Sequence, residues 1–225
     1  MAEIYQPEAI PKVVTYLSSL LQRVAEANDS SAATLTSPTS PLDSVPPPPQ
    51  KVSVFHGLCK PVISIQSYLE RIFRYANCSP SCFIVAYIYL DRFVSRQPAI
   101  PITSYNVHRL LITSVLVAAK FMDDLYYNNA YYAKVGGIST QEMNCLEIDF
   151  LFGIGFQLNV TPSTFHAYCK YLQREMLEFE SASLGACIQR PLKIHGRFPF
   201  SSPSSDESNS QSTQQLVACC TNKSV

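Results

Sequence analysis

The side chains that carry most enzymatic chemistry, histidine and cysteine, are scattered along this chain of 225 residues. No CxxC pair, HExxH helix, glycine-rich phosphate loop, DxD or GxSxG motif occurs in it. We therefore expect a protein that is not an enzyme and that has no catalytic residue, metal ligand or cofactor. The isolated side chains are His56, His108, His166 and His195, together with Cys59, Cys78, Cys82, Cys145, Cys169, Cys187, Cys219 and Cys220.

Two charged residues beside apolar helix faces are better candidates for a functional role. Lys120 ends a nearly continuous apolar run, and Glu147 lies at the edge of an apolar helical stripe. Each also has an ordinary structural interpretation, because such a lysine commonly extends its amine to water and an early helical glutamate interacts favourably with the helix dipole. Phe121 and Tyr127 follow in an aromatic-rich segment. Such side chains often anchor protein interfaces, although several of them are expected in the core.

The element that must position Lys120 is the segment from Thr103 to Asp124. Its apolar residues leave almost no polar face, which is typical of a helix that is buried all round. The run is too short to span a bilayer, so the segment predicts the central helix of an all-α bundle with Leu116 in its core. Thr103 or Ser104 is expected to cap its start.

Helical periodicity and capping signals predict further helices around this one. Ser64 and the Ser79-Pro80 pair mark two helix starts, and Ser139-Thr-Gln-Glu142 has the form of a capping box. The predicted organisation is an N-terminal amphipathic helix (1–27), a Ser/Thr/Pro-rich linker (28–52), a single five-helix domain (53–160), a C-terminal helix (161–180) and a disordered tail (181–225).

Composition restricts the partners and the location. Seventeen basic and 17 acidic residues balance, so neither nucleic acid nor a membrane surface is an expected partner. Only 15% of residues are charged, which favours a sizeable face covered by another protein. The N-terminus has no signal-peptide pattern, which predicts a protein of the nucleus or cytoplasm that is not secreted.

Three runs carry a resemblance to a known family. YLERIFRYANCSPSCFIVAYIYLDRF, the helix ending AAKFMDD, and ISTQEMNCLEIDFLFGIGFQLNV together resemble a cyclin box over about residues 50–175. PVISIQSYLERI and SPSCFIVAYIYLDRF are similar to the plant U-type (P-type) cyclins in particular, which are related to the yeast phosphate-signalling cyclins. The resemblance implies a non-catalytic subunit that binds and activates a cyclin-dependent kinase, an A-type kinase in plants, and is otherwise a monomer.

The same resemblance implies roles for particular residues. Lys120 in AAKF and Glu147 in CLEID match the lysine and glutamate with which cyclins reach the kinase's regulatory helix and the loop before it. Phe121 and Tyr127 are included as kinase-binding candidates, whereas Asp91, Arg92 and Leu116 are expected to be structural. The implied process is cell division or a nutrient-linked cell-cycle response.

Asp91 in YLDRF marks a departure from many cell-cycle cyclins. They pair this aspartate with an arginine of the MRAIL motif, and the equivalent run here is Pro61-Val-Ile-Ser-Ile65, without an arginine. Because a buried acid is costly unless paired, Arg71, Arg109 or a backbone group is the expected substitute. Other cyclins have a groove at this motif that binds Arg-x-Leu substrates. We do not predict such a groove for this chain.

One alternative from another class stays open, a helical adaptor with a cyclin fold that acts without a kinase. The sequence also leaves open which substrates are involved, whether the N-terminal helix contacts the kinase, and whether Ser37, Ser40 or Ser202 is phosphorylated.

Overall fold

The computed structural model describes residues 12–35 and 53–182. Within these residues the backbone forms seven α-helices and no β-strand, which confirms the predicted all-α class. The candidate phosphorylation residues Ser37, Ser40 and Ser202, the predicted linker beyond Leu35 and the predicted tail from residue 183 lie outside the described residues. The helices are α1 (Lys12–Leu35), α2 (Ile65–Tyr75), α3 (Pro80–Arg96), α4 (Val107–Met122), α5 (Asn129–Gly136), α6 (Thr140–Gly153) and α7 (Pro162–Ala182).

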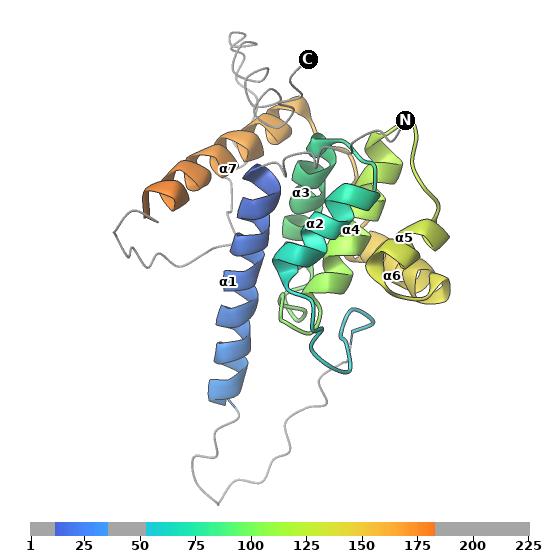
Figure 1. Cartoon of the computed structure of the whole chain (residues 1–225), viewed down its shortest axis with the longest axis horizontal. Helices are drawn as coiled ribbons and strands as arrows, with labels where there is room; N and C mark the ends of the chain where they lie inside the picture. Colours follow the sequence, from blue (N-terminus) through green and yellow to red (C-terminus); the bar gives the residue numbers. More distant parts are fainter. Residues whose placement is uncertain (1–11, 36–52, 183–225) are drawn as a thin grey trace, which may run out of the picture.

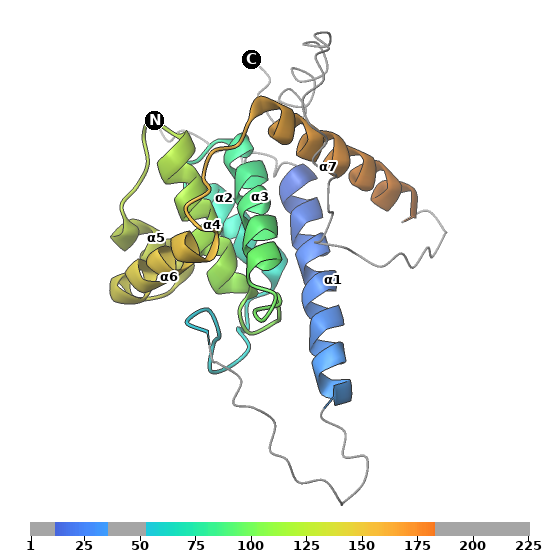
Figure 2. The ribbon, with the colours of Figure 1, turned by 180° about the vertical axis from the view of Figure 1, so that it is seen from behind.

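Helix α4 lies at the centre of the bundle, as its apolar sequence predicted. Every residue from Leu110 to Ala119 is buried, and α4 contacts α2, α3, α5 and α6. Leu116 has no exposed surface. Figures 1 and 2 show α1 and α7 along one side of the bundle and α5 and α6 on the opposite side. Burial of the α4 side chains on all sides is the main favourable contribution to this arrangement.

The start of α4 differs from the prediction, because the helix begins at Val107 and its N-cap is Asn106. The Asn106 side chain accepts a hydrogen bond from the main-chain N–H of Thr103 (2.8 Å) and donates one to the Pro101 carbonyl (2.8 Å). These bonds hold residues 103–106 as a turn. Thr103 and Ser104 therefore do not cap the helix.

Helix α1 is longer than predicted, since the segment 28–35 that was assigned to the linker is helical as far as Leu35. The Asn28 side chain donates to the Ile102 carbonyl (2.8 Å), and the Asp29 carboxylate accepts from the Ser104 main-chain N–H (3.2 Å). These tertiary bonds outweigh the low helix propensity of the segment. The apolar face of α1 is buried against the bundle, where α1 contacts α2 and α7.

The predicted caps of α2 and α6 are present. The Ser64 hydroxyl accepts from the Ser67 N–H (3.1 Å), and the Ser139 hydroxyl accepts from the Glu142 N–H (3.0 Å). The second half of the expected capping box is replaced, because the Glu142 carboxylate pairs with Arg109, with 2.6 Å between Oε1 and Nε. This ion pair connects α6 to the first half of α4.

The start of α3 is capped by a residue that follows another helix. The Ser79 hydroxyl makes no capping bond to its own helix and instead donates to the Asp123 carboxylate (3.3 Å). The second oxygen of Asp123 accepts from the Ser79 N–H (3.4 Å) and the Cys82 thiol (3.4 Å). A carboxylate that directly follows α4 thus lies at the N-terminus of α3, where negative charge is favourable.

Substitution of Leu116 tests the central position of α4. Leu116→Ala should lower the free energy of unfolding by about 2–5 kcal/mol, because it leaves a cavity in the core. Leu125→Ala is the matched control, since Leu125 is 85% exposed, and it should change stability by less than about 0.5 kcal/mol. Urea unfolding followed by circular dichroism measures both, and equal effects would contradict the central position of α4.

Candidate functional site

The two charged candidates, Lys120 and Glu147, lie beside each other. Lys120 is in the last turn of α4 and Glu147 is in the middle of α6, and 2.7 Å separates Lys120 Nζ from Glu147 Oε1. The Lys120 side chain is 30% exposed and that of Glu147 is 16% exposed. Two residues that are 27 positions apart therefore form one half-buried ion pair that still reaches the surface.

Two asparagines extend this pair into a larger group. Asn129 donates from Nδ2 to Glu147 Oε2 (2.6 Å) and to Asn144 Oδ1 (2.8 Å). We call Lys120, Asn129, Asn144 and Glu147 the polar cluster. Neither asparagine was predicted from the sequence, because neither belongs to an apolar stripe. The spacing of Asn144 and Glu147, three residues apart on one helix, could have indicated that they are neighbours.

Exposed apolar side chains follow Lys120 directly in the chain, in the segment that ends at Tyr127. We call this segment the 121–127 edge. Tyr127 stacks on Tyr131 with ring centroids 3.9 Å apart, and the Tyr131 hydroxyl donates to the Tyr75 carbonyl (2.8 Å). The edge consists of Phe121 (49% exposed), Met122 (44%), Leu125 (85%), Tyr126 (53%) and Tyr127 (39%).

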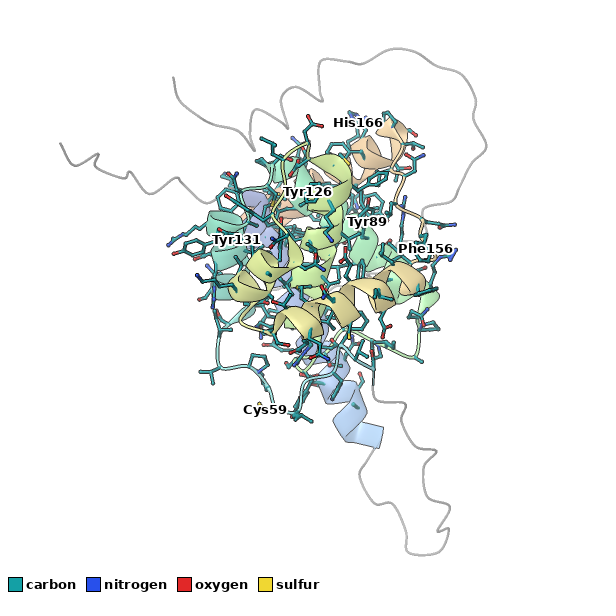
Figure 3. All side chains as sticks on the ribbon, turned by 90° about the vertical axis from the view of Figure 1, so that its right-hand side faces the viewer. Cys59, Tyr89, Tyr126, Tyr131, Phe156 and His166 are labelled. Carbon is teal, nitrogen blue, oxygen red and sulfur yellow. The ribbon has the colours of Figure 1, made fainter. Side chains whose placement is uncertain are left out.

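A second exposed apolar group, which the sequence analysis missed, runs along α6 and past its end. We call Ile148, Phe152 and Phe156 the α6 stripe; they are 54%, 67% and 56% exposed. The rings of Phe152 and Phe156 meet edge to face at 5.1 Å. Figure 3 looks onto the side formed by α5 and α6, with Tyr131 towards one flank, Phe156 towards the other and Tyr126 between them. The four-residue spacing of Ile148 and Phe152, which both lie on α6, was the available signal.

This combination is typical of a protein-binding surface. Exposed apolar side chains rarely gather on a monomer unless something binds them, and charges next to apolar groups fix the orientation of a partner. In the part of the chain that is described, no group of histidine, cysteine and acidic side chains could hold a metal ion. None of the described helices combines the length and apolar character that crossing a bilayer requires.

Asp91 has one partner that was not among those expected from the sequence. The Tyr168 hydroxyl of α7 donates to Asp91 Oδ2 (2.6 Å). Arg71 donates to the Lys134 carbonyl, and Arg109 pairs with Glu142, so the expectation that either arginine pairs with Asp91 was wrong. Burial, followed by the bond to Asp91, raises the pKa of the Tyr168 hydroxyl above its ordinary value.

Arg92 also makes contacts within the fold. Its guanidinium donates to the main-chain carbonyls of Gln157 (2.5 Å) and Asn159 (3.0 Å). These bonds hold the connection between α6 and α7 against α3. Arg92 therefore positions the segment that leads into the helix that carries Tyr168.

Comparison with known proteins adds independent information. A model of the family described as Cyclin matches residues 11–158. The chain is 65% identical to Cyclin-U4-1 of Arabidopsis thaliana over 184 residues, which cover 82% of this chain and 86% of the relative. It is 63% identical to Cyclin-P4-1 of Oryza sativa subsp. japonica over 173 residues, which cover 77% of this chain and 78% of the relative. The family match begins near the start of α1, so it includes the helix that was predicted to lie outside the box.

Removal of the Tyr168 hydroxyl tests the contact with Asp91. Tyr168→Phe should lower the free energy of unfolding by about 1.5–3 kcal/mol, because a half-buried carboxylate loses a hydrogen bond. Tyr126→Phe makes the same chemical change at a half-exposed ring and should have little effect. Thermal unfolding of both variants measures the difference, and an unchanged midpoint for Tyr168→Phe would rule out a stabilising role for the bond.

Proposed function

Since the chain belongs to the cyclin family, in its plant U-type (P-type) group, we propose that it binds and activates a cyclin-dependent kinase through the polar cluster, the 121–127 edge and the α6 stripe. Cyclins are non-catalytic regulators of kinases, so the bond-making chemistry belongs to the partner. The observation that carries the proposal is the ion pair between Lys120 and Glu147, which reaches the surface beside two exposed apolar groups.

The ion pair retains hydrogen-bonding capacity for a partner. Lys120 has three N–H donors, one of which is directed to Glu147, and the Glu147 carboxylate has more acceptor positions than its two bonds use. A lysine supplies only donors and an ionised glutamate only acceptors, so together they suit the main-chain carbonyls and N–H groups of a kinase loop. Both charges are already partly desolvated, which reduces the desolvation that binding still requires.

Binding at this surface would act on the kinase by moving an element of its active site. A kinase is active when a glutamate of its regulatory helix pairs with the lysine that contacts ATP. A cyclin that holds this helix inward stabilises the paired state, and the kinase population shifts to it. The free energy that shifts the kinase to its active conformation is thus the difference between the cyclin's binding free energies for the two kinase conformations.

The two apolar groups would supply much of the affinity in this proposal. Interface energy concentrates in a few large apolar or aromatic side chains that become fully covered, whereas charges around them give orientation. Phe121, Tyr127 and Phe152 are large side chains of this kind. An A-type kinase is the proposed partner, and cell division or a nutrient-linked cell-cycle response is the proposed process.

Exchange of the two charges tests the site without removing the ion pair. The double variant Lys120→Glu with Glu147→Lys should keep a higher thermal midpoint than either single variant, because opposite charges still face each other, although the bond from Asn129 is lost. It should lose at least about tenfold in kinase affinity, because donors and acceptors exchange places towards the partner. Calorimetric titration with a purified A-type cyclin-dependent kinase measures the affinity.

The single variants Lys120→Glu and Glu147→Lys are the controls for this experiment. Each places like charges at a contact of 2.7 Å, so both should be less stable than the double variant as well as defective in binding. A double variant that binds and activates the kinase as wild type does would refute the proposed site. If the wild-type protein itself does not bind the kinase, the kinase-independent adaptor is the better assignment.

Truncation of the α6 stripe tests its contribution to affinity. Phe152→Ala should weaken kinase binding by about tenfold, because a large exposed ring would otherwise be covered by the partner. Stability should hardly change, since the ring is 67% exposed in the free protein. Val62→Ala removes an exposed apolar side chain ahead of α2 and is the control. Equal affinities of these two variants would exclude the stripe from the interface.

A further inference from the structure

The polar cluster joins four side chains from three helices into one connected group. Glu147 receives one bond on each carboxylate oxygen, from Lys120 at 2.7 Å and from Asn129 at 2.6 Å. Asn129 is the only one of these partners on α5 and also contacts Asn144 on α6. The Glu147 carboxylate therefore has a positioned donor on either side.

The chemistry of the carboxylate determines how the two amides are oriented. An ionised glutamate can only accept hydrogen bonds, so the amide nitrogen of Asn129, and not its oxygen, must face Glu147. The second N–H of the same nitrogen then requires the oxygen of Asn144. Both donors of Asn129 are thus used within the cluster, and its function there is to hold other side chains.

Asn129 lies on an element that is itself held firmly. It is the first residue of α5, whose N-cap Asn128 accepts from the Tyr131 N–H at 3.0 Å. At the other end Gly137 has a φ of 72°, a left-handed conformation that suits glycine and ends the helix. The Tyr68 hydroxyl donates to the Gly136 carbonyl (3.2 Å). The donor that Asn129 presents to Glu147 is therefore fixed relative to the bundle.

Lysine and glutamate side chains have many rotamers, and a partner that must order them loses affinity. Restricting such a side chain on binding costs conformational entropy and lowers the affinity. A donor that restricts Glu147 in the free protein, and through it Lys120, removes part of this cost before binding. Asn129 itself is half-buried, beside the exposed surface.

We propose that Asn129 is a positioning residue for kinase recognition, which holds Glu147 and, through Glu147, Lys120 in the geometry that the kinase binds. This inference rests on the proposed function, because it assigns a role within the same site. It extends the recognition unit from the two charges to α5, a helix that contributes no charge to the ion pair. The proposal predicts coupling between Asn129 and Glu147 and not merely a loss of stability.

A double-mutant cycle tests this proposal with the full chain and a purified A-type cyclin-dependent kinase. Asn129→Ala should weaken kinase binding by about tenfold. In the Glu147→Ala background, the same change should have almost no further effect, because the side chain that Asn129 positions is gone. Losses of kinase affinity that add up in the two backgrounds would overturn the proposal. So would wild-type affinity of the Asn129→Ala variant if the Glu147→Ala variant binds the kinase weakly.

Asn129→Asp separates positioning from a general effect on α5. The substitution keeps the size of the side chain and adds a negative charge at a helix N-terminus, which should preserve or strengthen α5. It also places a second carboxylate against Glu147 and should weaken kinase binding at least as much as Asn129→Ala does. Asn129→Asp with unchanged affinity would overturn the proposal.

Measurements on the protein without kinase separate two results, one that refutes the role of Asn129 and one that refutes the proposed function. The same cycle measured by urea unfolding, without kinase, reports the Asn129–Glu147 interaction alone. Coupling in unfolding together with wild-type kinase binding by Glu147→Ala would refute the proposed site, and the role of Asn129 with it. Kinase binding that is sensitive to Glu147 but not to Asn129 would refute this inference and leave the proposed function intact.

Discussion

The burial of α4 is the constraint on which the rest of this structure depends. A helix that is apolar on every side must be covered on every side, and α2, α3, α5 and α6 contact it. Its last turn is where this cover ends, and Lys120 lies in that turn beside Glu147. The location of the candidate site therefore follows from the geometry of burial, since a charge can end such a helix only where its neighbours leave an opening.

Local signals were sufficient for most of the helical framework. The Ser64 and Ser139 caps act within a few residues of their own helix, so the sequence could predict them. The extension of α1 to Leu35 could not be predicted in this way. It depends on the bond that Asn28 donates and the bond that Asp29 accepts, both with residues more than 70 positions away. Tertiary contacts of this kind leave no periodic pattern.

The candidate site was predictable to a similar degree. Lys120 and Glu147 were identified from the family motifs, and their contact agrees with a shared location, while their role in binding stays a proposal. Asn129 was missed because an uncharged residue at a helix start has many ordinary explanations. The Asp91–Tyr168 bond was missed because only cations and backbone groups were considered as partners, whereas a phenol on α7, far along the chain from α3, donates to this carboxylate.

The cap that Asp123 supplies to α3 has a mechanical consequence for the surface beside it. Asp123 directly follows Lys120, Phe121 and Met122 and is bonded to the first residues of a helix that packs along α4. These bonds connect the end of α4 to the start of α3. A force on the side chains of residues 120–122 is therefore shared by two helices, which limits their displacement. When a more flexible protein binds this surface, most of the conformational change should therefore occur in that protein.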